Sequence, residues 1–237
     1  MSYQLPPDSA WVADNVTYGL PQAAREQNAA LIADYFSAVH GWTLTAIAGL
    51  LGNADLESTL NPGIWQNLQP PGTDWASRGG GFGLTQWTPG RVYLNWAGGG
   101  NYQYGGWSRQ LECWGEEYLH NPYDLNMWLK WDHTPSGGIP LSMFQISYRQ
   151  YAEAYDPSTG ESGDEDGLTP HYAGIIFWLN YGRPSPQNAT AERGTARGNS
   201  AQRWYTWLQQ HPPQGHLKDW LFYVIAKGSA NRNALTY

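Results

Sequence analysis

The sequence predicts an α+β protein in which helices dominate and one small β-hairpin forms a separate layer. Apolar residues recur at the spacing of a helix face in several segments. Residues 64–90 instead combine prolines, clustered glycines and isolated aromatic residues, which is typical of turns and short strands. Hydrophobic residues make up 41% of the 237 residues, and 14 Trp and 16 Tyr can fill a sizeable core. We therefore expect one main unit over residues 23–211, an N-terminal arm over 1–22 and a C-terminal helical tail over 212–237.

The contents of charge, cysteine and histidine exclude several functional classes. The net charge of −7 argues against nucleic-acid binding, which normally needs a basic patch. Cys113 is the only cysteine, so the chain can form neither an internal disulfide nor a thiolate metal cluster, and its acidic neighbours favour a packed core cysteine over a nucleophile. The six histidines lack the spacing of a zinc peptidase. We predict no metal and no cofactor.

The sequence shows no targeting or membrane segment. Its first residues, MSYQLPPDSAW, have neither the basic nor the apolar region of a signal peptide. The longest apolar run, Trp220–Ala226, is far too short to span a bilayer. We therefore expect no signal peptide and no membrane partner.

Two adjacent helices are predicted to begin the main unit. The apolar pattern of residues 23–40 indicates an amphipathic helix that Gly41 ends. The next helix starts near Thr43, and Asn61-Pro62-Gly63 stops it. Because the connection is so short, we expect these helices to be packed neighbours.

Glu57 is the candidate catalytic residue of this second helix. It lies in the last turn, in a row with Ile47, Leu50 and Ala54. The free carbonyl groups at the helix end and half-burial on an apolar face both favour the protonated carboxyl group. A protonated carboxyl group suits general-acid catalysis on an ether-like oxygen, and cleavage of a glycosidic bond is the commonest such reaction. The alternative is an exposed glutamate in a polar turn.

The remaining segments are predicted from their start and stop signals. Residues 64–90 are expected to form a loop and a small hairpin over the end of the Glu57 helix, and the next helix to begin near Arg91 with Thr88 as its N-cap. Helical patterns then cover residues 107–120, 124–131, 141–155 and, after the N-cap Thr169, the apolar segment up to Gly182. Residues 160–167 and 185–200 are predicted as solvated loops, and 201–210 as a last helix.

Four sequence blocks, in order, resemble the phage tail lysozyme family. They are GNADLESTLNPG, GFGLTQW followed by TP, FWLNYGRP and RGTARGNSAQRWYTWL, and the likeness covers about residues 25–210. The resemblance implies a mainly helical lysozyme-like fold with the hairpin beside an active-site cleft. It also implies cleavage of the β-1,4 bond between N-acetylmuramic acid and N-acetylglucosamine in peptidoglycan, with Glu57 as the general acid. The expected partners are peptidoglycan strands and other phage tail proteins.

The resemblance also places residues along the cleft. Gln86 matches a polar position beside the bound sugars, and Asn180 and Tyr181 match the aromatic position that faces the catalytic glutamate. From the residues alone, Trp65 and Trp87 are candidates for stacking on sugar rings, although most of the tryptophans must belong to the core.

A second carboxylate usually activates the water or acts as the nucleophile in glycoside hydrolysis. Asp74 is the first candidate because it follows Glu57 in the same loop system, and an Asx-turn is its structural alternative. Glu153 and Asp156 are weaker candidates. Without a second carboxylate, a substituent of the muramic acid would attack, and the enzyme would be a lytic transglycosylase with anhydro products. Asp55 is expected to point to another helix face and to be solvated.

We therefore predict a metal-independent muramidase that a phage virion carries and delivers to the host cell wall. Delivery by the particle would account for the missing signal peptide. Two other classes stay open: a tail structural protein that binds glycan without cutting it, and a secreted or conjugation-associated wall hydrolase.

Overall fold

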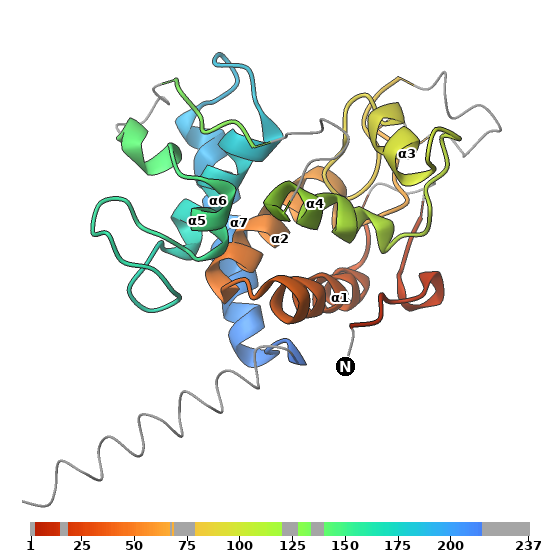
Figure 1. The fold of residues 1–237 in the computed structure, drawn as a ribbon, viewed down its shortest axis with the longest axis horizontal. Coiled ribbons are helices and arrows are strands. Elements are labelled where there is room, and N and C mark those ends of the chain that lie inside the picture. Colours follow the sequence, from red (N-terminus) through yellow and green to blue (C-terminus); the bar gives the residue numbers. More distant parts are fainter. Residues whose placement is uncertain are drawn as a thin grey trace, which may run out of the picture.

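The described part of the chain is built mostly of helices and the loops between them (Figure 1). The computed structural model describes residues 3–14, 19–66, 68, 79–119, 128–133 and 140–214. The α-helices are α1 Gln22–His40, α2 Leu44–Ser58, α3 Arg91–Ala97, α4 Arg109–Leu119, α5 Tyr148–Ala152, α6 Pro170–Phe177 and α7 Ala191–Gln210. Shorter helical segments are η1 Asp8–Ala10, η2 Leu141–Phe144 and the π-helical turn η3 Trp178–Gly182. Within these described residues, no helix has the length and apolar character needed to cross a membrane.

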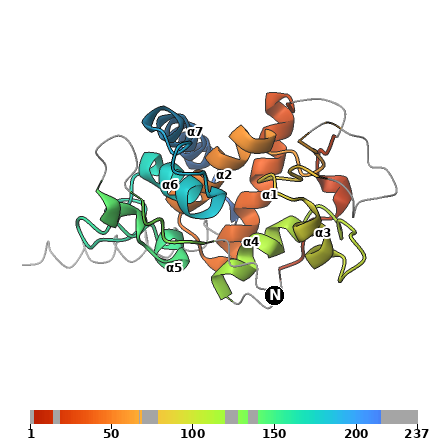
Figure 2. The ribbon, with the colours of Figure 1, turned by 90° about the horizontal axis from the view of Figure 1, so that it is seen from above.

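Helix α2 is the centre of the fold. Every residue from Leu44 to Asp55 is buried, as expected for a helix that neighbouring helices surround. Helices α6 and α7 pack along α2, and α1 packs against it from another side (Figures 1 and 2). Gly41, with a φ angle of 64°, ends α1 in the left-handed conformation. The prediction that α1 and α2 are packed neighbours joined by a short turn is therefore confirmed.

Helices α2, α6 and α7 approach one another closely because glycines lie at their contacts. A Cβ atom on Gly52 of α2 would lie 2.5 Å from the backbone nitrogen of Ala201 in α7. A Cβ atom on Gly174 of α6 would lie 2.6 Å from the carbonyl oxygen of Arg197 in α7. These distances leave no room for a larger side chain, so the helices meet backbone to backbone. This packing brings Arg197 to the end of α2, where Glu57 lies.

The acidic loop 160–167 caps the start of α2. The carboxylate of Asp164 accepts hydrogen bonds from the backbone N–H groups of Leu44 and Thr45, at 3.0 and 2.7 Å. The prediction that the whole loop is solvated was therefore wrong for Asp164. The free N–H groups at a helix N-terminus attract a carboxylate, even from a loop far away in the sequence.

The predicted β-hairpin is not confirmed in the described part of residues 64–90. That part contains two isolated antiparallel bridges, which join Trp65 to Phe82 and Phe82 to Trp87. The backbone of Phe82 bonds to that of Trp87 through two hydrogen bonds of 3.1 and 3.0 Å. A tight turn that begins at Gly83, with a φ angle of 77°, separates these two residues, so the pairing remains a single step without a strand ladder.

Helix boundaries in the second half differ from the prediction in several places. Helices α4 and α6 lie within the predicted segments, and Thr169 caps α6 as expected. Residues 141–155 divide into η2 and α5, and residues 128–131 are not helical. Residues 185–200, predicted as a loop, supply the first half of α7, which follows the N-cap Thr190. The glycines in this half lower its intrinsic helix propensity, and packing on α2 and α6 stabilises it.

The start of α3 also differs from the predicted cap. Helix α3 begins at Arg91 as predicted, but Gly90 precedes it and Thr88 does not cap it. The Thr88 hydroxyl group donates instead to the carbonyl oxygen of Gln86, at 2.8 Å. The described residues end at position 214, so the helix predicted for the C-terminal tail lies outside them.

Asp55 is buried and paired, so the prediction of a solvated side chain was wrong. The residue is 8% exposed, and its Oδ1 lies 3.2 Å from Nη1 of Arg25 in α1. Its Oδ2 accepts a hydrogen bond of 3.3 Å from the indole N–H of Trp204 in α7. Asp55 does point away from the face of Glu57, but α1 and α7 cover that side of α2.

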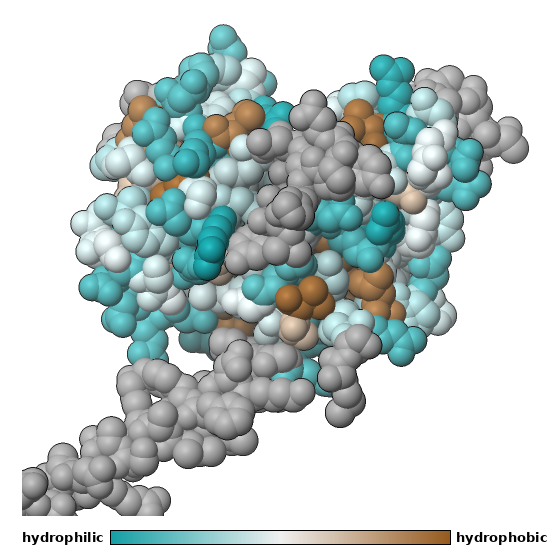
Figure 3. All heavy atoms as spheres, in the orientation of Figure 1, coloured by the Kyte–Doolittle hydropathy of each residue, from teal (hydrophilic) through white to brown (hydrophobic). Residues whose placement is uncertain are grey.

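The face of the molecule seen in Figure 3 is mainly polar where the chain is described. Figure 3 shows hydrophilic residues over most of the visible face and apolar residues in small, separate patches. The exposed large apolar residues of the described chain are Tyr3, Val39, Leu56, Val92 and Leu129. Trp11, near the N-terminus, is buried, and its indole N–H donates a hydrogen bond of 2.9 Å to the Ser108 hydroxyl group.

Burial of His40 predicts that the protein loses stability in acid. His40 ends α1, and its ring packs against Tyr35 and Phe36 with centroid distances of 5.1 and 5.7 Å. Burial lowers the pKa of His40 to about 4. An unfolded histidine titrates near 6.5, so the unfolded chain takes up the proton first as the pH falls. The stability that neutral His40 contributes is complete above about pH 6.5 and is lost as the pH falls towards 4.

We expect the melting temperature of the wild type to fall between pH 7 and pH 4.5, and that of a His40→Gln variant to fall less. Scanning calorimetry at both pH values measures this difference. His211, exposed after the end of α7, supplies the matched control, because His211→Gln should keep the wild-type pH dependence. Equal losses in His40→Gln and the wild type would contradict the assignment to His40.

Candidate active site

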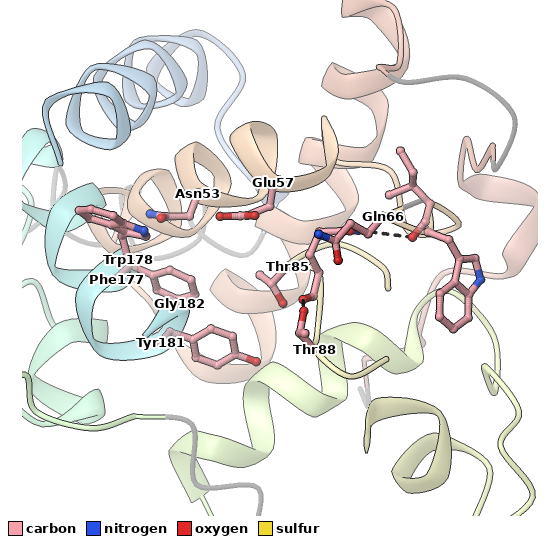
Figure 4. A pocket seen from close by; sticks show the side chains of 12 residues that line it. Asn53, Glu57, Gln66, Thr85, Thr88, Phe177, Trp178, Tyr181 and Gly182 are labelled. Atoms are coloured by element: carbon pink, nitrogen blue, oxygen red, sulfur yellow. Dashed lines mark hydrogen bonds between the residues drawn. The ribbon is translucent and has the colours of Figure 1, made fainter. Parts of the chain in front are cut away.

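A cavity of about 370 Å³ opens between the end of α2, the turn at residues 83–88 and the segment formed by α6 and η3 (Figure 4). A cavity of this size can hold a small ligand. It is lined by Asn53, Glu57, Ile64, Trp65, Gln66, Thr85, Gln86, Thr88, Phe177, Trp178, Tyr181 and Gly182. Segments distant in the sequence therefore converge here, and we take this cavity as the candidate active site.

Glu57 extends from the last turn of α2 into the cavity. Its side chain is 34% exposed, and Figure 4 shows its carboxyl group beside Asn53 and across the cavity from Tyr181. Thr59, with a φ angle of 53°, ends the helix two residues later. Glu57 supplies the one carboxylate among the described residues that line the cavity. Its place at the helix end therefore agrees with the sequence-based expectation.

Arg197 is a residue of the site that the sequence-based reasoning did not identify. Its Nη2 lies 2.6 Å from Oε1 of Glu57, and its Nη1 donates to the carbonyl oxygen of Asn53 at 3.2 Å. The Arg197 side chain is only 15% exposed, so the pair is partly shielded from water. The sequence predicted an apolar surrounding for Glu57, and the structure instead places a cation beside it. The sequence did not point to Arg197 because residues 185–200 were expected to form a loop, far along the chain from the Glu57 helix.

Asn53 presents a fixed acceptor to the cavity, one helical turn before Glu57. Its Nδ2 donates to the carbonyl oxygens of Gly49 and Gly174, both at 2.8 Å. Both hydrogens of the amide group are used in this way, so Oδ1 is the polar atom that Asn53 offers to a ligand. The hydrogen bond to Gly174 therefore joins α2 to α6 and orients a side chain of the site.

Tyr181 lines the wall that faces Glu57, whereas two other residues of the sequence motifs, Trp87 and Asn180, are buried behind that wall. The Tyr181 hydroxyl group accepts a hydrogen bond of 3.1 Å from the indole N–H of Trp87. Trp87 is buried, stacks on Tyr93 with a centroid distance of 4.6 Å and does not line the cavity. Asn180 is fully buried, where it donates to Phe144 and accepts from the backbone N–H of Trp131. Trp87 and Asn180 therefore shape the site from behind, without access to a ligand.

Gln86, Trp65 and Thr85 line the cavity on the side of the tight turn. The Nε2 of Gln86 donates to the carbonyl oxygen of Gly83 at 3.0 Å, so part of its amide stabilises the turn. Trp65 is only 2% exposed and packs on Phe82 with a centroid distance of 4.8 Å. The Thr85 Oγ1 is buried and has no hydrogen-bond partner among the described residues.

No second carboxylate is found at the cavity in the part of the chain that the structure describes. Asp74, the first candidate, lies outside the described residues. Glu153 pairs with Arg149 at 3.0 Å, and Asp156 accepts from the backbone N–H of Ser158 at 2.8 Å; neither lines the cavity. Among the described residues, no group of three or more His, Cys, Asp or Glu is placed to hold a metal ion.

Comparison with known proteins agrees with these features. The sequence profile of the family described as phage tail lysozyme matches residues 27–208. A curated relative, Morphogenesis protein 1 of Bacillus phage B103, is 60% identical over 57 residues. The aligned segment covers 24% of this chain and 14% of that protein, so the chain spans a small part of the relative it matches.

Proposed function

The chain belongs to the phage tail lysozyme family, and we propose that it cleaves the β-1,4 bond between N-acetylmuramic acid and N-acetylglucosamine in peptidoglycan. The observation that supports this activity is the position of Glu57, on the wall of a ligand-sized cavity at the end of a buried helix. A glycosidic bond needs a proton on its bridging oxygen when it breaks. Glu57 is the residue we assign to this step.

In the proposed reaction, protonated Glu57 donates to the bridging oxygen and is left as a carboxylate. The guanidinium group of Arg197, 2.6 Å from Glu57 in the structure, pairs with this carboxylate form, so the observed ion pair corresponds to Glu57 after it has given up its proton. Fixed charges and dipoles of this kind contribute to catalysis because they need no reorganisation during the reaction. Arg197 therefore acts through Glu57.

Other residues of the cavity would position the sugars. Asn53 Oδ1, held in place by the two hydrogen bonds of its amide nitrogen, is suited to accept the N–H of an acetamido group. Phe177, Trp178 and Tyr181 line the cavity although each is 6% exposed or less, so the edges of their rings would form its apolar contacts with a pyranose. Gln86 and Trp65 would contact the strand from the opposite side.

The second step decides between a hydrolase and a lytic transglycosylase. Asp74 remains our candidate for the base or nucleophile of a hydrolase. If no second carboxylate acts, a substituent of the muramic acid attacks, and the products carry anhydro ends.

We also propose that the protein is part of a phage virion, which delivers it to the cell wall of the host. The match to a tail lysozyme family and the likeness to a phage morphogenesis protein support this location. The relative's name also favours a second candidate function, a tail structural protein that binds glycan and does not cut it.

Release of dye from labelled cell walls, together with co-sedimentation on unlabelled walls, separates the two candidates. We expect both dye release and binding. Binding without release would favour the structural protein, and the absence of both would contradict a function at the cell wall.

A further inference from the structure

A second cavity, of about 500 Å³, adjoins the candidate active site along α7. The two cavities share Glu57, Trp178 and Gly182. The residues that line only the second one include Leu56, Asn188, Arg193 and Arg197. A ligand that fills the first cavity can therefore extend a substituent past Glu57 into the second.

The second cavity carries an excess of positive charge. Arg193 and Arg197 lie four residues apart, on the same face of α7. Arg197 is neutralised by Glu57, whereas Arg193 makes no ion pair with any residue that the structure describes. This local charge stands out in a chain with a net charge of −7.

The walls of this cavity suit an anion that is attached to an apolar group. Leu56, 45% exposed, is one of the exposed large apolar residues of the described chain, and Trp178 lies near it on the shared wall. A guanidinium group binds carboxylates through two parallel hydrogen bonds. The combination points to a carboxylate beside methyl or methylene groups.

We propose that the second cavity binds a carboxylate on the side arm of N-acetylmuramic acid, with Arg193 as its main ligand. This inference rests on the proposed function, because it needs the glycan strand in the first cavity. The muramic acid ring carries a lactyl group, and in the cell wall a short peptide with free carboxylates is attached to it. On a sugar that carries the peptide, the lactyl carboxyl group is tied up in the amide bond to it, and the peptide carboxylates supply the charge; on a sugar without the peptide, the free lactyl carboxylate supplies it. A neutral chitin-like strand offers neither.

The test compares peptide-bearing glycan strands with the same strands after carbodiimide conversion of their carboxylates into amides. We expect the wild type to have about a threefold to tenfold higher kcat/KM on the untreated strands, an advantage that salt reduces. In Arg193→Gln this ratio should fall close to one. A third substrate, strands stripped of peptide by an amidase, carries the free lactyl carboxylate alone. An advantage of these strands over their own amidated form, lost in Arg193→Gln, shows that the lactyl carboxylate also binds at the site, and the absence of such an advantage assigns the site to the peptide carboxylates.

Arg203→Gln is the matched control, because it removes the same charge from α7 at an exposed position that lines neither cavity. This variant should keep the wild-type ratio. An unchanged ratio in Arg193→Gln, or an equal loss in Arg203→Gln, would overturn the proposed site.

Binding affinities for both kinds of strand, measured by calorimetry, keep this test independent of catalysis. One outcome is that the protein binds untreated strands more tightly, loses this preference in Arg193→Gln, and yet cleaves neither kind of strand. This result would support the site and contradict the proposed activity. Equal affinities for both kinds of strand in the wild type would contradict the site, whatever the activity.

Discussion

A Glu57→Gln variant is expected to cleave peptidoglycan about 10²- to 10⁴-fold more slowly than the wild type, the usual contribution of a general acid. Glutamine keeps the shape of the side chain and an oxygen that can accept from Arg197, but it cannot give up a proton. The ion pair that is lost is partly exposed, with Glu57 at 34%, so the free energy of unfolding should change by no more than about 1 kcal/mol. Initial rates of dye release and a urea titration measure the two effects.

Glu153→Gln provides the control for this variant. Glu153 also pairs with an arginine, at 3.0 Å, but it is exposed on the surface and does not line the cavity. Its replacement should leave the rate unchanged. A Glu57→Gln enzyme whose rate lies within a few-fold of the wild type would show that another group supplies the proton.

A Gly52→Ala variant is expected to lose about 1–3 kcal/mol of stability, although alanine is the better helix former. The added Cβ atom would lie 2.5 Å from the backbone nitrogen and 2.7 Å from the Cα atom of Ala201. Backbone atoms cannot rotate away as a side chain can, so α7 must move. Because α7 carries Arg197, the same change should also lower the catalytic rate. Urea denaturation and dye release on the same preparation test both effects.

The matched control is Gly194→Ala, a change of the same type in α7. A Cβ atom there would lie 3.7 Å from its nearest neighbours, Ile175 and Trp178, which is ordinary contact. This variant should be as stable as the wild type or more stable, by up to about 1 kcal/mol. If Gly52→Ala were also stabilised, the close contact between α2 and α7 would not exist in solution.

Local sequence signals predicted the centre of the fold correctly. Three local features were enough to place α1 and α2: the helical spacing of apolar residues, the short turn at Gly41 and the helix-terminating residues 61–63. They also placed Glu57 at the helix end. These features depend on neighbours within one or two helical turns, and the sequence shows such neighbours directly.

Contacts between distant segments could not be predicted in this way. Arg197 lies 140 residues after Glu57, and the burial of Asp55 depends on Arg25 and Trp204 in two other helices. The first half of α7 is polar and contains glycines, so its helix depends on packing that no local window contains. Asp164 likewise caps α2 from a loop that its own composition predicts to be solvated.

Within the candidate site, the direction in which a motif residue points decides whether it lines the cavity, and its residue type matters less. Tyr181 and Asn180 are adjacent in the sequence, yet one lines the cavity and the other is fully buried. Successive residues of a helix point about a quarter-turn apart or more, so a motif alone does not tell which of them reaches a ligand. No motif argument singled out Asn53, which lines the cavity and is held there by its hydrogen bond to Gly174 in another helix.

Mass spectrometry of peptidoglycan digests, with the wild type and Glu57→Gln in parallel, is the most direct test of proton donation by Glu57. We predict that the wild type releases fragments that end in N-acetylmuramic acid, with reducing ends for a hydrolase or anhydro ends for a transglycosylase. Glu57→Gln should release almost none. Uncut glycan strands in the wild-type digest, or equal yields of these fragments from both proteins, would contradict the account.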